Sequence, residues 1–280
     1  MEGALTAQRA VRVVGLRCRT SDRGPNSLAG VDALAPLLGE RLGVDVRMIG
    51  SPGEPARRSW QEDLASSRGC LLEAGGQVDD ALGAGEVPIL VAGQCTIALT
   101  TLAAVARHRP DARVLWLDAH GDFNTPATTP SDFLGGMALA GACGRWDPGL
   151  DAGPPFPTDR LVMCGVRDLD AQEREALERS PATVIGAALE TLVYLQNALD
   201  GGPTYVHLDL DVLDPSAMPA EHPADGGLSP EKLYDLLDAV ADSCELVGLE
   251  IACLEDPALA DVVAGLVAPL LDAPAQDRTM

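Results

Sequence analysis

The sequence predicts an α/β fold of three layers, in which helices cover both faces of a mostly parallel β-sheet. Two observations support this prediction. Short runs of apolar residues recur along the 280-residue chain, and amphipathic stretches separate them. Strands that are apolar along their whole length are typical of parallel sheets buried on both faces. Neither a repeat nor a clear linker divides the chain, so we expect one domain over residues 1–280.

The expected strands are short apolar segments bounded by Gly, Pro or polar residues. In chain order they are Val11–Gly15, Val44–Ile49, Pro88–Val91, Val114–Leu117, Leu161–Cys164, a weaker candidate at Thr183–Ile185, Tyr205–Leu210 and Leu246–Ile251. The expected helices are longer segments with helical periodicity. They are Gly30–Arg41, Gln61–Ala84, Thr96–Arg107, Ala171–Glu178, Ala187–Leu199, Pro230–Ala241 and Pro257–Leu271.

The composition excludes several classes of partner. With 20 basic and 42 acidic residues, the formal charge of −22 repels nucleic acids and acidic membrane surfaces. The uncharged stretch from Val87 to Ala106 has the pattern of a strand, a turn and a helix, and we do not expect it to span a membrane. The seven cysteines are scattered and form no CxxC pair, which favours a reducing, cytoplasmic compartment over a disulfide framework.

Two clusters of acidic residues follow buried strands. Asp118, His120 and Asp122 alternate directly after the strand that ends at Leu117, and they point the same way if the chain stays extended. Asp209 and Asp211 form the second cluster, at the end of the strand that begins at Tyr205. Because buried carboxylates are costly unless paired or bound to metal, these clusters predict a pair of divalent metal ions that activate water.

A third strand end carries Cys95 at the start of the following helix. A helix N-terminus lowers the pKa of a thiol, which would make thiolate chemistry possible. The alternative is a small buried hydrophobic residue, the usual environment of a free cysteine.

The two acidic motifs resemble the aspartate signatures of the ureohydrolase family, which includes arginases and agmatinases. The motifs are Asp118-Ala119-His120-Gly121-Asp122 and the segment from His207 to Pro215, and Val166–Asp170 and Gly226–Ser229 resemble two further loops of the family. This resemblance implies an arginase-like fold around an eight-stranded sheet, two Mn²⁺ ions, and hydrolysis of a small guanidino compound to urea or a urea analogue.

The resemblance also implies roles for particular residues. One metal would be held by Cys95, Asp118, Asp122 and Asp209, and the other by Asp118, His120, Asp209 and Asp211. Because the family's histidine shuttle is absent from this chain, we expect Asp122 to carry the proton to the leaving amine. Asn124 and Ser131 match positions that bind an α-carboxylate, and Asp170 matches one near the α-amino group.

The sequence departs from the family pattern around the expected metal centre. Cys95 stands where most members have a histidine ligand, and Phe133 and Gly135 replace the Asn and the proton-shuttling His of arginases. Because thiolate is a soft donor better suited to zinc than to manganese, we expect the metal beside Cys95 to bind more weakly or to be a different element.

A further departure concerns the residue that would bind the guanidinium group. Cys253 stands where the family has a Glu, so either Glu250 or Glu255 replaces it or the substrate is not an ordinary guanidine. We therefore expect both Glu250 and Cys253 to contact the substrate. Losing the carboxylate would forfeit a charge-assisted hydrogen bond of about 1.5–3 kcal/mol.

The segment from Asn124 to Asp147 resembles one branch of the family in particular. That branch hydrolyses an N-hydroxylated arginine to hydroxyurea and ornithine during antibiotic biosynthesis. Two alternatives stay open: hydrolysis of another guanidino compound, of the arginase, agmatinase or guanidino-acid type, and a catalytically weak relative that acts as a binding subunit. The sequence leaves the oligomeric state open.

Overall fold

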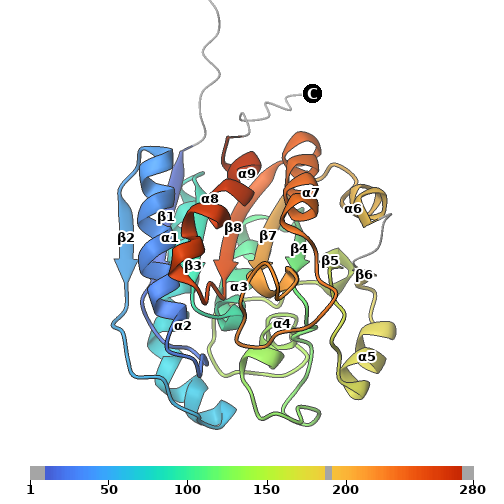
Figure 1. Cartoon of the computed structure of the whole chain (residues 1–280). Helices are drawn as coiled ribbons and strands as arrows, with labels where there is room; N and C mark the ends of the chain where they lie inside the picture. The colour runs from blue at the N-terminus through green and yellow to red at the C-terminus, as the bar shows by residue number, and fades with distance from the viewer. Residues whose placement is uncertain (1–9, 187–190, 273–280) are drawn as a thin grey trace, which may run out of the picture.

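The computed structural model describes residues 10–186 and 191–272 of the chain. Within these ranges, eight strands form one sheet in the order β2-β1-β3-β8-β7-β4-β5-β6, and every neighbouring pair is parallel. The strand arrows in Figure 1 accordingly point the same way. The strands are β1 Val11–Leu16, β2 Val46–Ile49, β3 Val87–Ala92, β4 Arg113–Leu117, β5 Leu161–Cys164, β6 Thr183–Ile185, β7 Thr204–Asp209 and β8 Leu246–Ala252. The predicted eight-stranded parallel sheet is confirmed.

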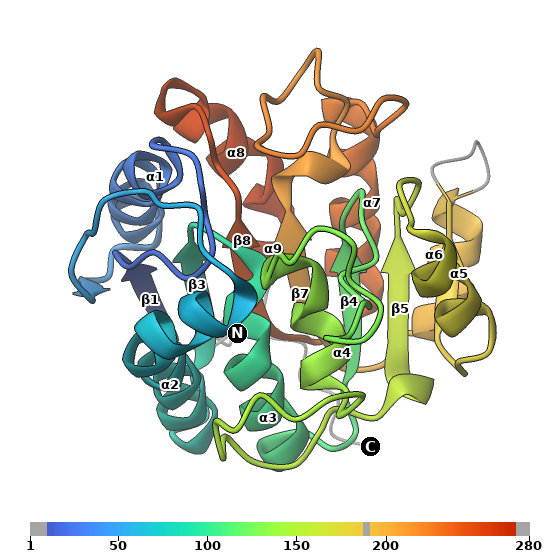
Figure 2. The same ribbon diagram turned by 90° about the horizontal axis from the view of Figure 1, so that it is seen from below.

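Helices cover both faces of this sheet. Those described are α1 Ser27–Leu42, α2 Trp60–Gly83, α3 Ala98–His108, α4 Ala138–Ala142, α5 Ala171–Glu178, α6 Thr191–Leu199, α7 Pro230–Ser243, α8 Ala260–Leu266 and α9 Ala268–Asp272. Figure 2 shows α1, α7 and α8 on one side of the sheet and α2 and α3 on the other. The three-layer arrangement predicted from the sequence is therefore confirmed.

Two apolar layers form the core, one on each face of the sheet. Alternate residues of each strand enter different layers: Leu115 and Leu117 of β4 pack toward α1 and α7, whereas Val114 and Trp116 pack toward α2 and α3. Both sets of side chains are fully buried. This is why the central strands are apolar along their whole length.

Several expected helix boundaries shift. The uncharged stretch forms β3, the 3-10 turn Cys95–Ile97 and α3, and no helix among the described residues is long and apolar enough to cross a membrane. The helix expected over Pro257–Leu271 is divided into the 3-10 turn Pro257–Leu259, α8 and α9. Pro269 accounts for the last break, because without an amide hydrogen it cannot donate the helical hydrogen bond to the carbonyl of Gly265. The first four residues of the helix expected at Ala187–Leu199 lie outside the described ranges.

A disulfide joins Cys18, after β1, to Cys70 in α2, with a Cα–Cα distance of 6.4 Å. The scattered cysteines had favoured free thiols, and for this pair that expectation is wrong. Folding places the two residues in contact although 52 positions separate them in the sequence, so their spacing gave no signal. The other five cysteines are free.

Candidate metal centre

The register of the central strands gathers the candidate ligands at one edge of the sheet. Asp209, the last residue of β7, pairs with Ala252, the last residue of β8. Asp118 follows β4 on the other side of β7. Cys253 follows β8, and Cys95 opens the turn after β3. The carboxyl ends of four neighbouring strands thus bring these side chains together, as is usual for ligand sites in parallel sheets.

The first group of donor atoms belongs to Asp118, His120 and Asp211. Their ligand atoms all lie within 4.8 Å of one another. His120 Nδ1 is 3.0 Å from Asp211 Oδ2 and 3.4 Å from Asp118 Oδ1. Backbone amides hold the carboxylates in place, because His120 N donates to Asp118 Oδ1 at 2.6 Å and Ala119 N donates to Asp211 Oδ1 at 3.0 Å.

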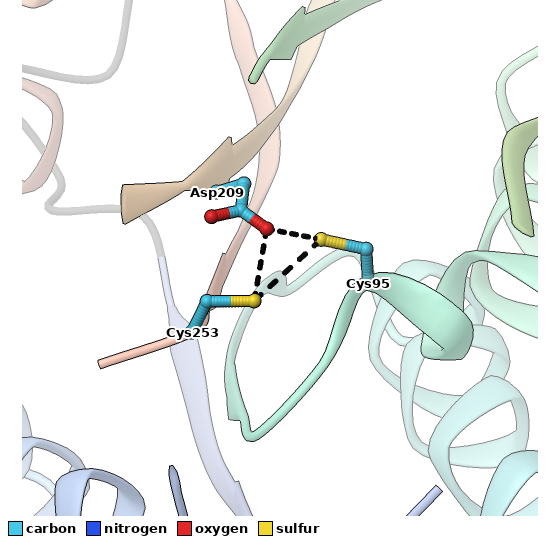
Figure 3. A group of neighbouring side chains, drawn as sticks. All are labelled: Cys95, Asp209 and Cys253. Atoms are coloured by element: carbon cyan, nitrogen blue, oxygen red, sulfur yellow. Dashed lines mark hydrogen bonds between the residues drawn. The ribbon is translucent and has the colours of Figure 1, made fainter. Parts of the chain in front are cut away.

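The second group belongs to Cys95, Asp209 and Cys253. Their donor atoms also lie within 4.8 Å of one another, and all three residues are buried. The thiol of Cys95 donates to Asp209 Oδ2 at 2.7 Å, and the thiol of Cys253 donates to the same oxygen at 2.8 Å. Figure 3 shows the three side chains pointing toward one another. The two sulfur atoms are 4.0 Å apart.

Both groups lie at a cavity of about 390 Å³. Most of the predicted site residues line it: Asp118, His120, Asp122, Asn124, Ser131, Asp170, Asp209, Asp211 and Cys253. Cys95 lies behind the wall, in contact with Asp209. Asp122 lines the cavity but belongs to neither donor group, because the chain does not stay extended: its φ is +47°, so the alternation expected from the sequence ends there.

The cluster is strongly acidic and almost fully buried. The exposed fractions of Asp118, Asp122, Asp209 and Asp211 are 1%, 7%, 4% and 6%. Burial and then the charge of a neighbouring carboxylate raise the pKa of Asp118, and the same two causes raise the pKa of Asp122 and Asp209 well above the usual value. Four carboxylates this close are expensive to ionise unless cations lie among them.

His120 supplies positive charge to this cluster. Burial disfavours its charged form, but hydrogen bonds to Asp118 and Asp211 outweigh burial and raise the pKa of His120 to about 12. Burial also opposes ionisation of Asp211, yet its hydrogen bond with His120 holds the pKa of Asp211 below the usual value. Protonated His120 thus supplies, between Asp118 and Asp211, the positive charge that a bound cation would supply.

The donor chemistry fits divalent metal ions. One group offers two carboxylates and an imidazole, which suit a hard or borderline cation such as manganese, and the other offers two thiols and a carboxylate. These two groups share no residue, but a third group, Cys95, Asp118 and His207, takes one residue from each and connects them. The residues could therefore hold two cations side by side at the floor of one cavity.

The environment of Cys95 differs from the expectation. Burial, the hydrogen bond with Cys253 and the charge of Asp209 raise the pKa of the Cys95 thiol well above its usual value. The predicted lowering by a helix N-terminus is wrong, because Cys95 opens a three-residue 3-10 turn beside a carboxylate. A thiolate at this position needs a cation to balance it.

A buried polar network lies directly behind the centre. The Nδ1–H of His207 donates to Glu250 Oε1 at 2.6 Å, and the Tyr205 hydroxyl donates to Glu250 Oε2 at 2.8 Å. The His207 ring stacks on Trp116 with 3.5 Å between centroids, and Trp116 Nε1 donates to Asp118 Oδ2 at 3.0 Å. Strand register explains the contacts, because Trp116, His207 and Glu250 are paired neighbours on β4, β7 and β8.

Neither of the two glutamates near Cys253, Glu250 and Glu255, lies in the cavity wall. Glu250 is fully buried with both oxygens engaged, so its position does not support the predicted contact with substrate. Glu255 is also buried and lies beside the loop at Gly24. The register of β8 turns Glu250 toward α2 and α3, and Cys253 takes the place that faces the cavity.

The predicted residues for the amino-acid end of a substrate lie at the rim. Asn124 Nδ2 donates to Asp170 Oδ2 at 2.9 Å, so the two side chains are held together. Ser131 is exposed on the following loop. Beside them, Phe133 fills the wall next to Gly135, with its ring 4.8 Å from that of His222.

Sequence reasoning missed several residues of the cavity wall. Arg23 and Glu221 come from separate loops that meet here, with Arg23 N donating to Glu221 Oε1 at 2.8 Å. Glu173 accepts from Phe123 N at 2.7 Å and also forms the capping box of α5 with Asp170. That capping box was the one signal in the sequence, because Glu173 follows Asp170 by three positions.

An acidic two-group centre at the carboxyl edge of a parallel sheet defines the class of a metal-dependent hydrolase. The chain belongs to the arginase family, whose model matches residues 55–267. This family depends on a binuclear metal centre, and the described residues contain donor groups for one.

Individual relatives agree with this assignment. The chain is 36% identical to N(omega)-hydroxy-L-arginine amidinohydrolase of Streptomyces lavendulae over 261 residues, which are 92% of this chain and 94% of that protein. It is 31% identical to an arginase of Bacillus caldovelox, over 82% of this chain and 83% of the relative. The crystal structure of arginase from Bacillus subtilis matches with a TM-score of 0.83 at 25% identity, covering 97% of this chain and 100% of that one. The chain is thus a hydrolase of amidino or guanidino C–N bonds.

Proposed function

We propose that the protein hydrolyses Nω-hydroxy-L-arginine to hydroxyurea and L-ornithine. The observation that carries this proposal is Cys253, which lines the cavity where a guanidinium ion would need a free carboxylate. An N-hydroxyguanidine is less basic than a guanidine, so it can react as the neutral form. The named relative from Streptomyces lavendulae supports the same substrate.

The reaction adds water across one C–N bond. The oxygen of water bonds to the amidino carbon, the bond from that carbon to the side-chain nitrogen breaks, and this nitrogen gains a proton to become the amine of ornithine. Divalent cations bound at the centre would supply the acidity that lets water ionise and attack near neutral pH. The buried carboxylates hold this centre and exclude bulk water from it.

Asp122 is the residue that we propose for the proton transfer. It lines the cavity, is almost fully buried and belongs to neither donor group, so a carboxyl oxygen is available to hold a proton. Gly135 carries no side chain at the position of the arginase shuttle histidine. Asp122 can deliver its proton to the leaving nitrogen as general acid.

The rim residues fit the amino-acid end of this substrate. Asp170 offers an exposed carboxylate to an α-ammonium group, and Asn124 and Ser131 offer donors to an α-carboxylate. These contacts would fix the substrate so that its N-hydroxyguanidino end reaches the floor of the cavity.

We further propose that manganese occupies the group of Asp118, His120 and Asp211, whose oxygen and nitrogen donors suit it. The sequence resemblance of residues 124–147 to a branch from antibiotic biosynthesis supports the same setting for this protein. Five free cysteines support a cytoplasmic location, whereas the disulfide between Cys18 and Cys70 is the feature that does not.

A substrate panel tests the proposal. The protein, purified without chelator and supplied with Mn²⁺, is assayed with Nω-hydroxy-L-arginine, L-arginine, agmatine and a guanidino acid, and hydroxyurea, urea and the amine product are quantified. We expect kcat/KM for Nω-hydroxy-L-arginine to exceed that for L-arginine by about 10²-fold or more. A preference for L-arginine, agmatine or the guanidino acid would overturn the assigned substrate.

A further inference from the structure

Two thiols and one carboxylate form a compact donor group on one side of the centre. The group consists of Cys95, Asp209 and Cys253, which are all buried although up to 158 positions separate them in the sequence. We propose that Cys253 is a metal ligand, so that the cation on this side is a zinc ion held by both thiolates and Asp209. This inference takes the two-cation centre of the proposed function as its starting point and assigns different metals to its two sides.

The distance between the sulfur atoms fits such a site. Two thiolates bound at about 2.3 Å to a tetrahedral zinc ion are roughly 3.8 Å apart. Cys95 Sγ and Cys253 Sγ are 4.0 Å apart, so neither residue has to move far. The sulfur–oxygen distances of 2.7 and 2.8 Å reflect hydrogen bonds, and the carboxylate must turn away as a cation replaces the thiol protons.

The backbone directs Cys253 into this position. β8 ends at Ala252, which is paired with Asp209, and the next residue has a φ of +65°. This left-handed conformation is uncommon for a residue with a side chain, and such residues concentrate at functional sites. The turn places the Cys253 sulfur beside Asp209 at the floor of the cavity.

The two donor groups differ in chemical softness. Cys95 and Cys253 supply sulfur, which selects zinc and other thiophilic cations, whereas the group of Asp118, His120 and Asp211 supplies only oxygen and nitrogen. Binding of Zn²⁺ breaks the two S–H bonds, forms two Zn–S bonds and releases two protons to solvent. A single centre would thus hold zinc on one side and manganese on the other.

X-ray absorption at the zinc edge tests the proposal on the unaltered protein. Metal-free protein is reduced with a phosphine, loaded with one equivalent of Zn²⁺ and one of Mn²⁺, and freed of unbound metal. We expect one tightly held zinc with two sulfur neighbours at about 2.3 Å. One sulfur neighbour, or none, would overturn the assignment of Cys253 as a ligand.

A variant pair gives a second measurement. In Cys253→Ser we expect one sulfur neighbour and a loss of zinc affinity of about 10²-fold or more in competition with a chelating dye. Cys164→Ser is the matched control, because Cys164 is a buried free thiol at the end of β5 and belongs to neither donor group. Equal zinc affinity in Cys253→Ser and the control would overturn the proposal.

The metal readouts are separate from turnover. Zinc bound through two sulfurs in a protein that hydrolyses no N-hydroxyguanidine would sustain this inference and overturn the proposed function. If Cys253→Ser keeps its metals but shows a raised KM for Nω-hydroxy-L-arginine, Cys253 contacts substrate, and the inference fails while the proposed function stands.

Discussion

Substitution of Glu250 tests whether this residue supports the candidate metal centre or binds the substrate. Its two oxygens accept hydrogen bonds from His207 and Tyr205 in a fully buried network. Glu250→Ala removes both acceptors and leaves two buried donors unpaired, which costs about 3–5 kcal/mol, as for the loss of one partner of a buried pair. Glu250→Gln keeps the shape and one acceptor, so we expect about half of that loss.

This loss is large enough for thermal unfolding to detect. An entropy of unfolding of about 2.1 cal/mol/K per residue gives roughly 0.6 kcal/mol/K for a chain of this length, so 4 kcal/mol lowers Tm by about 7 °C. We expect the melting temperature of metal-free Glu250→Ala to fall by this amount, followed by circular dichroism. Because His207 stacks on Trp116, which donates to Asp118, metal affinity should also fall.

The opposite pattern would refute this reasoning. If Glu250→Ala melts like the wild type, keeps its metals and shows only a raised KM, then Glu250 binds substrate. Tyr205→Phe is the matched control, because it removes one donor to Glu250 and leaves the cavity wall unchanged. We expect it to cost about 1–3 kcal/mol with little effect on KM.

Three further predictions concern other parts of the chain. Asp122→Asn should reduce kcat for hydroxyurea release by about 10²–10⁴-fold at saturating metal, because the proton donor is lost, and a kcat close to wild type would contradict this role. Burial raises the pKa of Glu173 from 4.5 to about 7, so the unfolded chain releases this proton before the native protein does. Wild-type stability, measured by urea unfolding of metal-free protein, should therefore fall relative to Glu173→Gln by about 3 kcal/mol as pH rises from 4.5 to 7, and parallel pH curves would disprove it. The disulfide between Cys18 and Cys70 closes a loop of 52 positions, so its reduction should lower the free energy of unfolding by up to about 4 kcal/mol. The stability of Cys18→Ser should not change with reductant. An unchanged urea midpoint of the wild type on reduction would argue against the bond.

The pattern of apolar and polar residues along the chain was sufficient to predict most of the helices and strands. The central strands are apolar throughout because both faces are buried, and this signal located β4, β5 and β7 to within one residue at either end. Boundaries were less accurate where local chemistry allowed several outcomes, as at the interrupted helix before Pro269. The order of the strands could not be read from the chain, because pairing joins segments that are far apart in sequence.

The sequence by itself was enough to locate the acidic residues of the candidate centre. Asp118, Asp209 and Asp211 lie at strand ends, and all strands of a parallel sheet end at the same edge. Only the tertiary structure decided where the side chains of Cys95, Cys253 and Glu250 lie relative to the cavity. Cys95 and Cys253 meet because β3 and β8 are neighbours, and Glu250 points away from the cavity because side chains alternate along a strand. Register and strand order are properties of the folded sheet. Contacts between residues distant in sequence can therefore be recognised only in the tertiary structure.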